Sequence, residues 1–381
     1  MKTGQLMPVS EVFVSVPDPR SKRQARHDLS ELLTVAVCAV LCGANDFVDV
    51  ALWGKSNLAW LRKFLKLKAG APSHDTFCRV LAMIDPAAFE AAFLRWVGVL
   101  VPALAPGSVV AIDGKTSRRS GGKDTSGPLH MVSAFAAGMG LVLGQRATDQ
   151  KSNEITAIPE LLAMLALEGT IVTIDAMGTQ AAIARTIRSR GADYVLCVKD
   201  NHPTLTDSIL LTLARVAGKI APASHVEEQT KGHGRVEVRR CWAYDAVSQL
   251  YKSEQWAGLQ SFALVERERT VDGKTSIERH YYISSLPADA ARIAQAVRSH
   301  WAVENQLHWS LDVQFNDDQS RVRRGYAANN FVVLRHIVLN LLRHNTTRKA
   351  SIKSKRLLAC MEDEFREQLL GFVAWAPVND K

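Results

Sequence analysis

Apolar residues recur at helical spacing through the first hundred positions of the chain. Residues 28–44, DLSELLTVAVCAVLCGA, begin with a polar residue and contain no helix breaker before Gly43, so they predict a helix that ends there. Two further helical patterns follow at 48–67 and 73–84. Together they predict a helical N-terminal domain over residues 1–100, which could bind DNA or serve only to pack.

From residue 108 the pattern changes to short apolar runs that alternate with helical segments. The elements predicted are strands 108–113, 130–137 and 141–147, helix 154–166, strand 170–176, helix 179–190 and strand 193–199. Three strands followed by helix, strand, helix and strand indicate an α/β fold with a mixed sheet and helices on its faces. This order is the one expected of a ribonuclease-H-like core, whose first part would span residues 101–225.

Residues 226–286 interrupt that alternation with a β-rich insertion. The strands predicted in it are 235–246, 261–271 and 276–286. Asp272-Gly273 is a favourable hairpin turn between the last two. The helical pattern then returns, so we expect a helix to complete the core over 287–345, followed by a basic C-terminal tail over 346–381.

The distribution of charge along the chain favours a polyanionic partner. The 381 residues carry a net charge of 47 − 38 = +9. Ten Lys or Arg and no acid lie between residues 319 and 356: Arg321, Arg323, Arg324, Arg335, Arg343, Arg348, Lys349, Lys353, Lys355 and Arg356. Such a block suits nucleic acid first and an anionic membrane second, although a solvated helix face is the plainer alternative.

The cysteine positions and the lengths of the apolar runs indicate the cellular compartment of the protein. The six cysteines include no C-x-x-C pair and lie mostly in apolar runs, as is typical of reduced core residues in a cytosolic protein. The N-terminal stretch lacks the apolar core of a signal peptide, and the longest apolar run, 32–44, is shorter than the roughly 20 residues of a membrane span. We therefore expect a soluble, cytoplasmic protein.

Two aspartates follow buried strands of the predicted sheet. Asp113 ends the run VVAID, and Asp175 ends VTID. One such Asp is often only a turn former or helix cap, but two on neighbouring strands would repel each other unless a cation or proton intervenes. Mg²⁺ prefers such carboxylate ligands, completed by water and phosphate oxygens.

A third carboxylate lies in the segment 299–315, SHWAVENQLHWSLDVQF. At about 100° per residue, an unbroken helix places Glu304 at the centre of the apolar stripe, with His300 and His308 on either side. A buried carboxylate must be neutral, paired with a cation such as arginine, or bound to a metal. Asp312 is the rival acid, but it falls at the edge of the stripe.

The same helix offers an alternative metal site. His300, Glu304 and His308 are spaced at i, i+4 and i+8, and this spacing could bind zinc. No H-E-x-x-H motif is present, however, and a zinc site here would leave both strand aspartates unexplained.

The ordered set of motifs resembles the Asp-Asp-Glu transposases of bacterial insertion sequences, and most closely their H-repeat-associated type. The motifs that carry the resemblance are AIDGKTSRRS, KSNEITAIPELL, TIDAMGTQ, VKDNHPTL and HWAVENQLHWSLDVQFNDDQSR. The resemblance covers most of the chain, including the helical head. The chain departs from the wider superfamily, which often has Tyr and Arg before the Glu and Lys after it, because those positions hold Val297, His300 and Leu311.

The resemblance implies a DNA transposase that cleaves transposon ends and joins them to target DNA. Asp113, Asp175 and Glu304 would hold two Mg²⁺ ions, for which Mn²⁺ could substitute. His300 and His308 would orient the site from a second layer, or only pack. Double-stranded DNA would be the partner, bound by a homodimer.

Basic residues near the motifs are the expected DNA contacts: Lys115, Arg118, Arg119, Lys151, Arg321, Arg323 and Arg324. Lys151 belongs to a polar group with Asn153 and Glu154 before a predicted helix. Trp242 and Trp256 could stack on an unpaired base, although core packing is the plainer reading. Two other functions stay open, a catalytically silent DNA-binding protein derived from a transposase, and a nuclease of the same fold without strand transfer.

Overall fold

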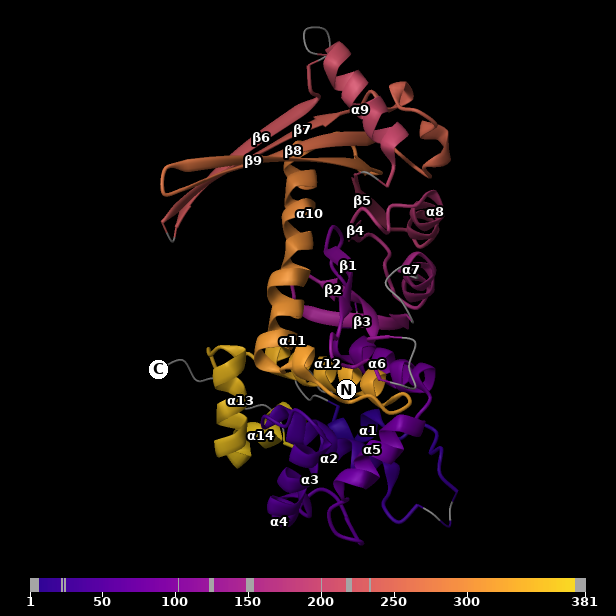
Figure 1. The fold of residues 1–381 in the computed structure, drawn as a ribbon, viewed down its shortest axis with the longest axis vertical. Helices are drawn as coiled ribbons and strands as arrows, with labels where there is room; N and C mark the ends of the chain where they lie inside the picture. The colour runs from indigo at the N-terminus through magenta and orange to yellow at the C-terminus, as the bar shows by residue number, and fades with distance from the viewer. Residues whose placement is uncertain are drawn as a thin grey trace.

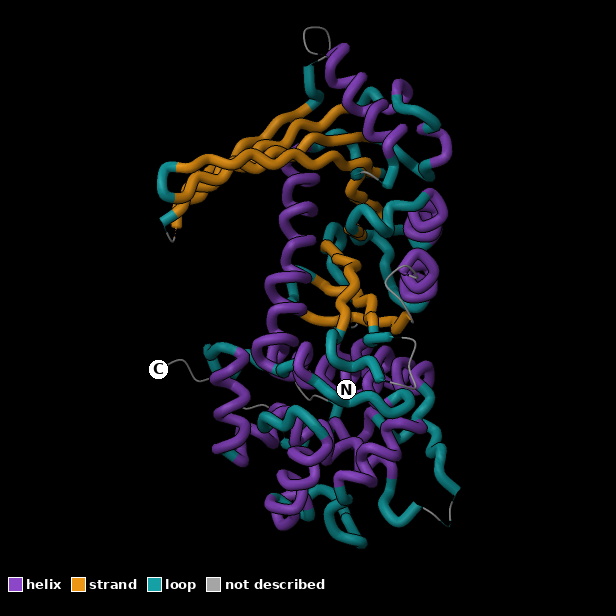
Figure 2. Tube along the Cα trace, in the orientation of Figure 1, coloured by secondary structure: helices purple, strands orange, loops and turns teal. Residues whose placement is uncertain are grey.

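The computed structural model is an elongated molecule with a helical region at one end of a large β-sheet (Figure 1). Strands β6 to β9 project sideways, and a long helix runs from them toward the helical region (Figure 2). The chain is described over residues 7–21, 23, 25–101, 103–122, 127–148, 154–199, 201–216, 221–232 and 234–373. The expected α/β architecture, with a mixed sheet and a helical N-terminal region, is confirmed.

The N-terminal helices begin at side chains that cap them. They are α1 (Val9–Val12), α2 (Leu29–Leu41), α3 (Phe47–Ser56), α4 (Leu58–Leu61), α5 (His74–Met83) and α6 (Pro86–Leu100). The carboxylates of Asp28, Asp46 and Asp85 accept first-turn N–H groups of α2, α3 and α6, which those helices leave unbonded. Helix α2 is buried over almost its whole length and forms the centre of the helical region.

The sheet contains nine strands in the order β3-β2-β1-β4-β5-β9-β8-β7-β6. They are β1 (Val109–Thr116), β2 (His130–Ala136), β3 (Leu141–Thr148), β4 (Ile171–Ile174), β5 (Asp193–Val198), β6 (Ser224–Gly232), β7 (Arg235–Tyr244), β8 (Ser261–Val271) and β9 (Lys274–Ser284). β4 pairs in parallel with β1 and β5, whereas every other neighbouring pair is antiparallel.

Helices cover both faces of this sheet. α7 (Glu154–Ala163), α8 (Ala181–Ser189) and α9 (Pro203–Val216) pack with the main core, and α10 (Ala290–Ala302) packs with a second one. On β5, Leu196 belongs to the first core and its neighbours Val195 and Cys197 to the second. Because successive strand residues face opposite sides, α10 lies on the opposite face from α7 and α8, as Figure 1 shows.

The β-rich region continues the core sheet. β5 and β9 join the two parts through pairs from Val195↔Ser284 to Val198↔Tyr281. Asp272 and Gly273 have φ of 49° and 74°, the left-handed conformation that the predicted hairpin turn needs. The sequence pattern does not predict β6, an edge strand that is mostly polar and carries little of the apolar alternation typical of strands.

The helix that carries Glu304 is not an unbroken α-helix. α10 passes into a π-helical segment, Val303–His308, and then into α11 (Trp309–Gln314). A π-turn bonds i to i+5, so it rotates the following residues relative to an ideal α-helix. Val303 and Leu307 are buried and Glu304 is exposed, so the prediction that Glu304 lies at the centre of the buried stripe is wrong.

The expected basic tail is folded over most of its length. α12 (Ala327–His344), α13 (Ile352–Met361) and α14 (Asp363–Leu369) pack with the N-terminal helices. Trp60 Nε1 donates to Glu367 Oε1 at 2.9 Å, and the rings of Phe64 and Phe372 stack. The two ends of the chain therefore build one helical region.

The basic tract divides into buried, half-buried and exposed residues, and Arg343 and Arg356 are the half-buried ones. Arg335 and Lys355 are buried, and Lys355 Nζ donates to the carbonyl oxygens of Leu342 and Asn345 at the end of α12. Its exposed members are Arg321, Arg323, Arg324, Arg348, Lys349 and Lys353. The tract is thus no single basic strip. In the described part of the chain, no helix has both the length and the apolar character to cross a bilayer.

Candidate active site

The parallel pairing of β1 with β4 brings two aspartates to the same level of the sheet. The last parallel pair is Ile112↔Ile174, and the next residues are Asp113 and Asp175. β1 itself continues to Thr116 through its antiparallel pairing with β2. Asp113 therefore does not end its strand, as the sequence suggested, but both aspartates lie just past the last parallel pair, as expected.

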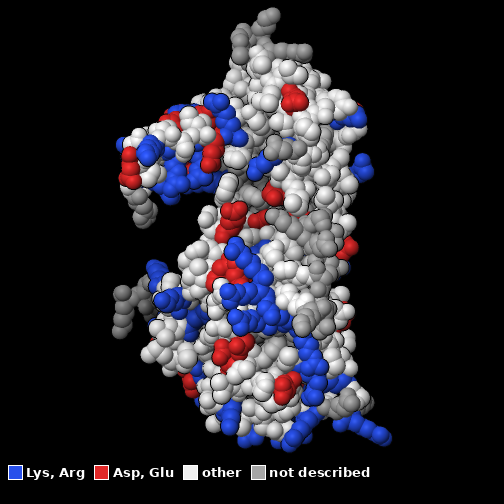
Figure 3. Space-filling view, in the orientation of Figure 1, with Lys and Arg blue, Asp and Glu red and all other residues white. Residues whose placement is uncertain are grey.

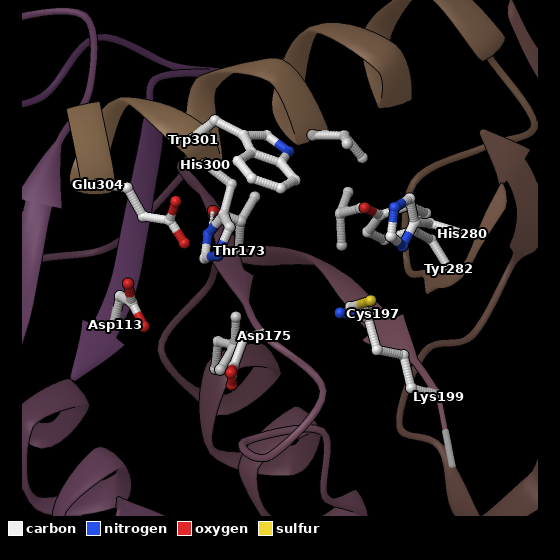
Figure 4. Close-up of a pocket in the computed structure, with 13 residues that line it drawn as sticks. Asp113, Thr173, Asp175, Cys197, Lys199, His280, Tyr282, His300, Trp301 and Glu304 are labelled. Atoms are coloured by element: carbon white, nitrogen blue, oxygen red, sulfur yellow. Dashed lines mark hydrogen bonds between the residues drawn. The ribbon is translucent and has the colours of Figure 1, made fainter. Parts of the chain in front are cut away.

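A cavity of about 130 Å³ contains both aspartates and Glu304. Its lining also includes His300, Trp301 and His280. In Figure 4 the Glu304 carboxylate points toward that of Asp113, whereas the Asp175 carboxylate turns away from both. The three acids predicted from the sequence thus line one cavity, from β1, the end of β4 and the π-helical segment.

Asp175 also has the plainer role considered for it. Its Oδ1 accepts the N–H groups of Met177 at 3.1 Å and Gly178 at 3.4 Å. The carboxylate closes the turn that follows β4, while its residue lines the cavity. The two roles are compatible because a carboxylate has two oxygens.

Burial and repulsion raise the pKa of Asp113. Removal from water is the largest cause, and the charge of Asp175 adds to it, so the pKa rises from 3.8 to about 7. Glu304 and Glu154 act in the same direction, and the N–H of Gly114, 2.9 Å from Asp113 Oδ1, opposes them. The lining holds one lysine, Lys199, against three acids. The cavity therefore carries more negative charge than its neighbours neutralise, a condition that a divalent cation would relieve.

Both histidines are half-buried beside the acids and stay neutral at pH 7. His300 Nδ1 lies 3.0 Å from Thr173 Oγ1, and His308 Nδ1 lies 3.6 Å from Asp113 Oδ2. Burial lowers the pKa of each ring from 6.5 to about 4. His300 thus packs against β4 and His308 against the carboxylate of β1, so both are in reach to orient the site.

A second acidic group lies nearby, but its charge is already compensated. Within the described residues, the one group of three His, Cys, Asp or Glu whose ligand atoms all lie within 4.8 Å is Asp312, Asp317 and Asp318. The ligand atoms of His300, Glu304 and His308, the alternative zinc site, therefore do not form such a group. Lys115 Nζ lies 2.7, 3.2 and 3.0 Å from the oxygens of the three aspartates, and Arg335 bonds Asp317.

This arrangement corrects the role expected of Lys115. Its side chain is 10% exposed and occupies the acidic group, so it is not free to meet a DNA phosphate. Asp312, the rival to Glu304, is held by the same lysine. Two residues of the IDGK motif therefore act differently: Asp113 faces the cavity, and Lys115 joins β1 to the segment after α11.

The glycine of that motif, Gly114, has a third role, which the sequence does not predict. A Cβ on Gly114 would lie 2.4 Å from both Glu154 Oε1 and His130 Nε2. These two atoms are 2.6 Å apart, and His130 Nδ1 lies 2.7 Å from Thr116 Oγ1. Only glycine leaves room for this buried pair against β1, beside Asp113. Spacing along the chain gives no sign that His130, on the next strand, completes it.

Exposed arginines from two loops lie next to each other. Arg118 is 81% exposed although its Nε lies 3.1 Å from Asp318 Oδ2, so most of its side chain faces solvent, unlike that of Lys115. Arg119 is exposed, and its carbonyl oxygen accepts a hydrogen bond from Arg323 Nε at 2.8 Å. Arg321, Arg323 and Arg324 line a groove of about 520 Å³ with the first residues of α3 and α5. Figure 3 shows a basic band on this side of the molecule. Lys151 and Asn153 lie outside the described residues.

Trp242, Trp256 and Trp301 differ in their exposure and in their contacts. Trp256 is 7% exposed and lies against His202, and Trp242 stacks on His225 at 5.1 Å. Both therefore favour the packing interpretation. Trp301 is 40% exposed and lines the cavity beside Glu304.

Comparison with known proteins covers nearly the whole chain. Residues 10–97 match the family described as DDE_Tnp_1-associated, and residues 104–341 match the family described as Transposase DDE domain. The chain is 38% identical over 368 residues to "Putative transposase YncI" of Escherichia coli O157:H7, covering 94% of this chain and 93% of that one. It is 37% identical over 375 residues to "H repeat-associated putative transposase YhhI" of Escherichia coli K12, covering 96% and 98%.

A solved structure also matches over most of the chain. It is the cryo-EM structure of a piggyBac transposase synaptic complex with hairpin DNA, with a TM-score of 0.43 and 10% identity. The match covers 98% of this chain and 78% of that one.

Proposed function

The chain belongs to the DDE transposase family, as its motifs predicted, and we propose that it is a Mg²⁺-dependent transposase that cleaves transposon ends and joins them to target DNA. The observation that carries the proposal is the uncompensated negative charge around Asp113. Its pKa of about 7 reflects burial next to Asp175 and Glu304 in one cavity. That site is built to take up positive charge.

The proposed core is ribonuclease-H-like. Its strand order β3-β2-β1-β4-β5, with antiparallel β1–β3 and parallel β4 and β5, supports this proposal. In this scheme residues 101–225 and 287–345 form the core, 226–286 the insertion, and 1–100 a helical domain. Residues 346–381 then follow the core, with α13 and α14 folded onto the helical domain.

Asp113, Asp175 and Glu304 are the proposed holders of two Mg²⁺ ions, which Mn²⁺ could replace. In the described part of the chain, their ligand atoms do not all lie within 4.8 Å of one another, and two ions would use a wider set of ligands than one. When bound, such ions neutralise developing charge on the attacking and leaving oxygens. To contribute both oxygens, Asp175 would turn partly from the N–H groups of its own loop.

The proposed reaction has two phosphoryl transfers. In the first, the oxygen of water bonds to phosphorus as the bond to the 3′-oxygen breaks, which leaves a 3′-hydroxyl on the transposon end and releases a proton to solvent. In the second, that hydroxyl attacks a target phosphodiester and displaces another 3′-oxygen. His308, neutral and 3.6 Å from Asp113, would hold that carboxylate in place.

Double-stranded DNA is the proposed partner, bound by a homodimer in the cytoplasm. Arg118, Arg119 and Arg323 lie next to each other and would contact phosphates near the cavity. Arg321 and Arg324 would extend that contact along the groove toward α3 and α5. Lys115 is omitted from this set because three aspartates hold it.

Two assays test the proposal together. Wild-type protein should nick uncut transposon ends only with Mg²⁺ or Mn²⁺, and should join precut ends to target DNA. Glu304→Gln should lose both activities and keep DNA binding. The matched control is Glu160→Gln, an exposed acid on α7 whose side chain is 56% exposed.

The results separate the alternatives. Cleavage without joining would identify a nuclease, and binding without either would identify a silent DNA-binding protein. Full activity in Glu304→Gln would reject Glu304 as a metal-holding residue.

A further inference from the structure

The wing, formed by β6, β7, β8 and β9, has two chemically different faces. Residues paired across the strands share a face, so the pairs Cys241↔Val265 and Ala263↔Tyr282 belong to the side that packs on α10. We call this side the inner face. The opposite side, which includes Tyr244 and packs toward α9, is the outer face.

Pairing along the strands assigns each charge to a face. On the inner face lie Arg235, Arg239, Arg267, Arg269 and Lys274 with Glu228, Glu237 and Glu278, which gives 5 − 3 = +2. On the outer face lie Lys231, Arg240 and Arg279 with Glu227, Glu266 and Glu268, which gives 3 − 3 = 0. The two faces of one sheet therefore present different charge.

The ion pairs strengthen this contrast. On the outer face one arginine, Arg240, is held by three glutamates at 2.7 to 3.0 Å. On the inner face, one glutamate is instead shared by two arginines. Glu237, which is 3% exposed, lies 2.7 Å from Arg239 and 2.6 Å from Arg267. With Arg279 on Glu266, the outer cluster has three acids and two bases. With Glu278 3.8 Å from Arg267, the inner cluster has two of each, so only the outer cluster carries an excess of acid.

Farther out, the inner face carries cations that no carboxylate holds. Arg235, Arg269 and Lys274 are exposed, and none has a salt bridge within 4.0 Å in the described part of the chain. Each therefore keeps its full charge available to a partner.

The inner face is continuous with the candidate active site. His280 and Tyr282 of β9 line the cavity with the three acids. One pair farther out, the Arg267 guanidinium lies 6.0 Å from the ring of Trp301, another lining residue. From the pair Val265↔His280 to the pair Val271↔Lys274 the strands run six residues, about 20 Å at about 3.3 Å per residue.

Figure 3 shows the space that this face borders. A deep notch separates the wing from the helical region, with Lys and Arg along the side of the wing that faces it. We propose that the inner face of the wing binds the phosphate backbone of duplex DNA whose reacting bond lies in the cavity. This inference rests on the proposed function and adds a second contact surface to the arginines around Arg323.

Electrostatics suits this partner. A duplex carries one negative charge per about 1.7 Å of its axis, and each lysine or arginine that neutralises a phosphate releases condensed counterions. A track of about 20 Å covers more than half of a helical turn of about 34 Å. The wing would therefore extend the footprint of the protein away from the cavity on one side.

The test compares two charge-neutralising changes on opposite faces of the wing. Arg269→Gln removes an exposed inner-face cation, and Lys231→Gln removes an exposed outer-face cation. Binding of full-length protein to a duplex of a transposon end would be measured over a range of salt concentrations. The slope of log affinity against log salt should fall by about 1 in Arg269→Gln and by about 2 in the Arg235→Gln/Arg269→Gln double variant, and stay unchanged in Lys231→Gln.

The outcomes separate this inference from the proposed function. Wild-type slopes in both inner-face variants, from a protein that binds and cleaves normally, would overturn the inference alone. An equal loss in Lys231→Gln would also overturn it, because the effect would then be one of net charge. A wild-type protein that binds no duplex DNA in low salt would reject the proposed function, and this inference with it. Thermal unfolding of each variant checks that the wing is intact.

Discussion

Two groups of three acids lie beside strand β1, and they differ in what neutralises them. Asp113, Asp175 and Glu304 share a cavity, and the pKa of Asp113 is raised there by burial and by its acidic neighbours. We call this the open group. Asp312, Asp317 and Asp318 form the closed group, which surrounds Lys115.

Burial alone does not explain why the pKa of Asp113 is raised and the pKa of Asp317 is lowered. Burial pushes the pKa of Asp317 upward, yet Arg335 and Lys115 outweigh it and bring that pKa below the ordinary value. Asp113 is also taken out of water, but acids surround it. Tight clustering of carboxylates is therefore a poor guide to a metal site, because the tighter group is already satisfied from within the chain.

Removing an acid of the open group should have the largest effect. Asp113→Asn takes away a charge that the proposed ions require, and such ions supply several kcal/mol of stabilisation to the reacting oxygens. Cleavage of transposon ends should fall more than about 1,000-fold. Gel assays of end cleavage measure this, and the same protein should shift labelled DNA as the wild type does.

Removing an acid of the closed group should act mainly on the free energy of unfolding rather than on the rate of cleavage. Asp317→Asn leaves Arg335 buried without its partner, which typically costs about 3 to 5 kcal/mol. Denaturant unfolding with Asp318→Asn as the control would measure it, since the Asp318 side chain is 20% exposed.

The pH dependence of this loss has a defined sign. Because the folded-state pKa of Asp317 lies below 3.8, its stabilisation is present above about pH 4 and is lost as pH falls through the lowered pKa. The stability gap between the wild type and Asp317→Asn should therefore narrow below pH 4. A gap that widens on acidification would contradict the assigned pairing.

Disturbing the support of the open group should have an intermediate effect. In Gly114→Ala the new Cβ would meet Glu154 and His130 at 2.4 Å, so β1 must shift next to Asp113. Cleavage should fall about 10- to 100-fold, as is usual when a residue that orients a metal ligand is lost. Gly138→Ala is the control, because its Cβ would meet nothing within 4 Å. Equal rates in the two variants would show that the Glu154–His130 pair does not support the site.

Changes among the exposed arginines should have the smallest effect. Arg324→Gln removes one proposed phosphate contact in the groove near α5. Affinity for duplex DNA should fall to a similar degree for all sequences, and the salt slope should fall by about 1. The cleavage rate at saturating DNA should stay at the wild-type value. A fall in that rate would place Arg324 in the chemistry instead.

The sequence predicted the open group better than the closed one. Asp113 and Asp175 follow apolar strands, and strand pairing alone brings them together. An ideal helix predicts Glu304 at the centre of the buried stripe, yet Glu304 is exposed in the π-helical segment and lines the cavity. The predicted residue is in the cavity although the predicted burial is wrong, because no local sequence pattern predicts a π-turn.

Long-range contacts set the limits of prediction. Lys115 follows Asp113 by two residues, which suggested a phosphate contact, but its partners lie about two hundred positions away in the chain. Arg335 and Lys355 looked like part of a DNA-binding tract and are buried in the helical region. The sequence shows which residues are basic. Only tertiary packing decides whether other groups of the same chain already bind that positive charge.

Manganese binding followed by electron paramagnetic resonance tests the central claim most directly. The measurement compares the wild type, Asp113→Asn and Asp318→Asn, each bound to transposon-end DNA. The open group should hold the ions, so the wild type and Asp318→Asn should bind Mn²⁺ alike and Asp113→Asn should lose that binding. Loss of Mn²⁺ in Asp318→Asn, together with wild-type binding in Asp113→Asn, would contradict the account and place the metal in the closed group.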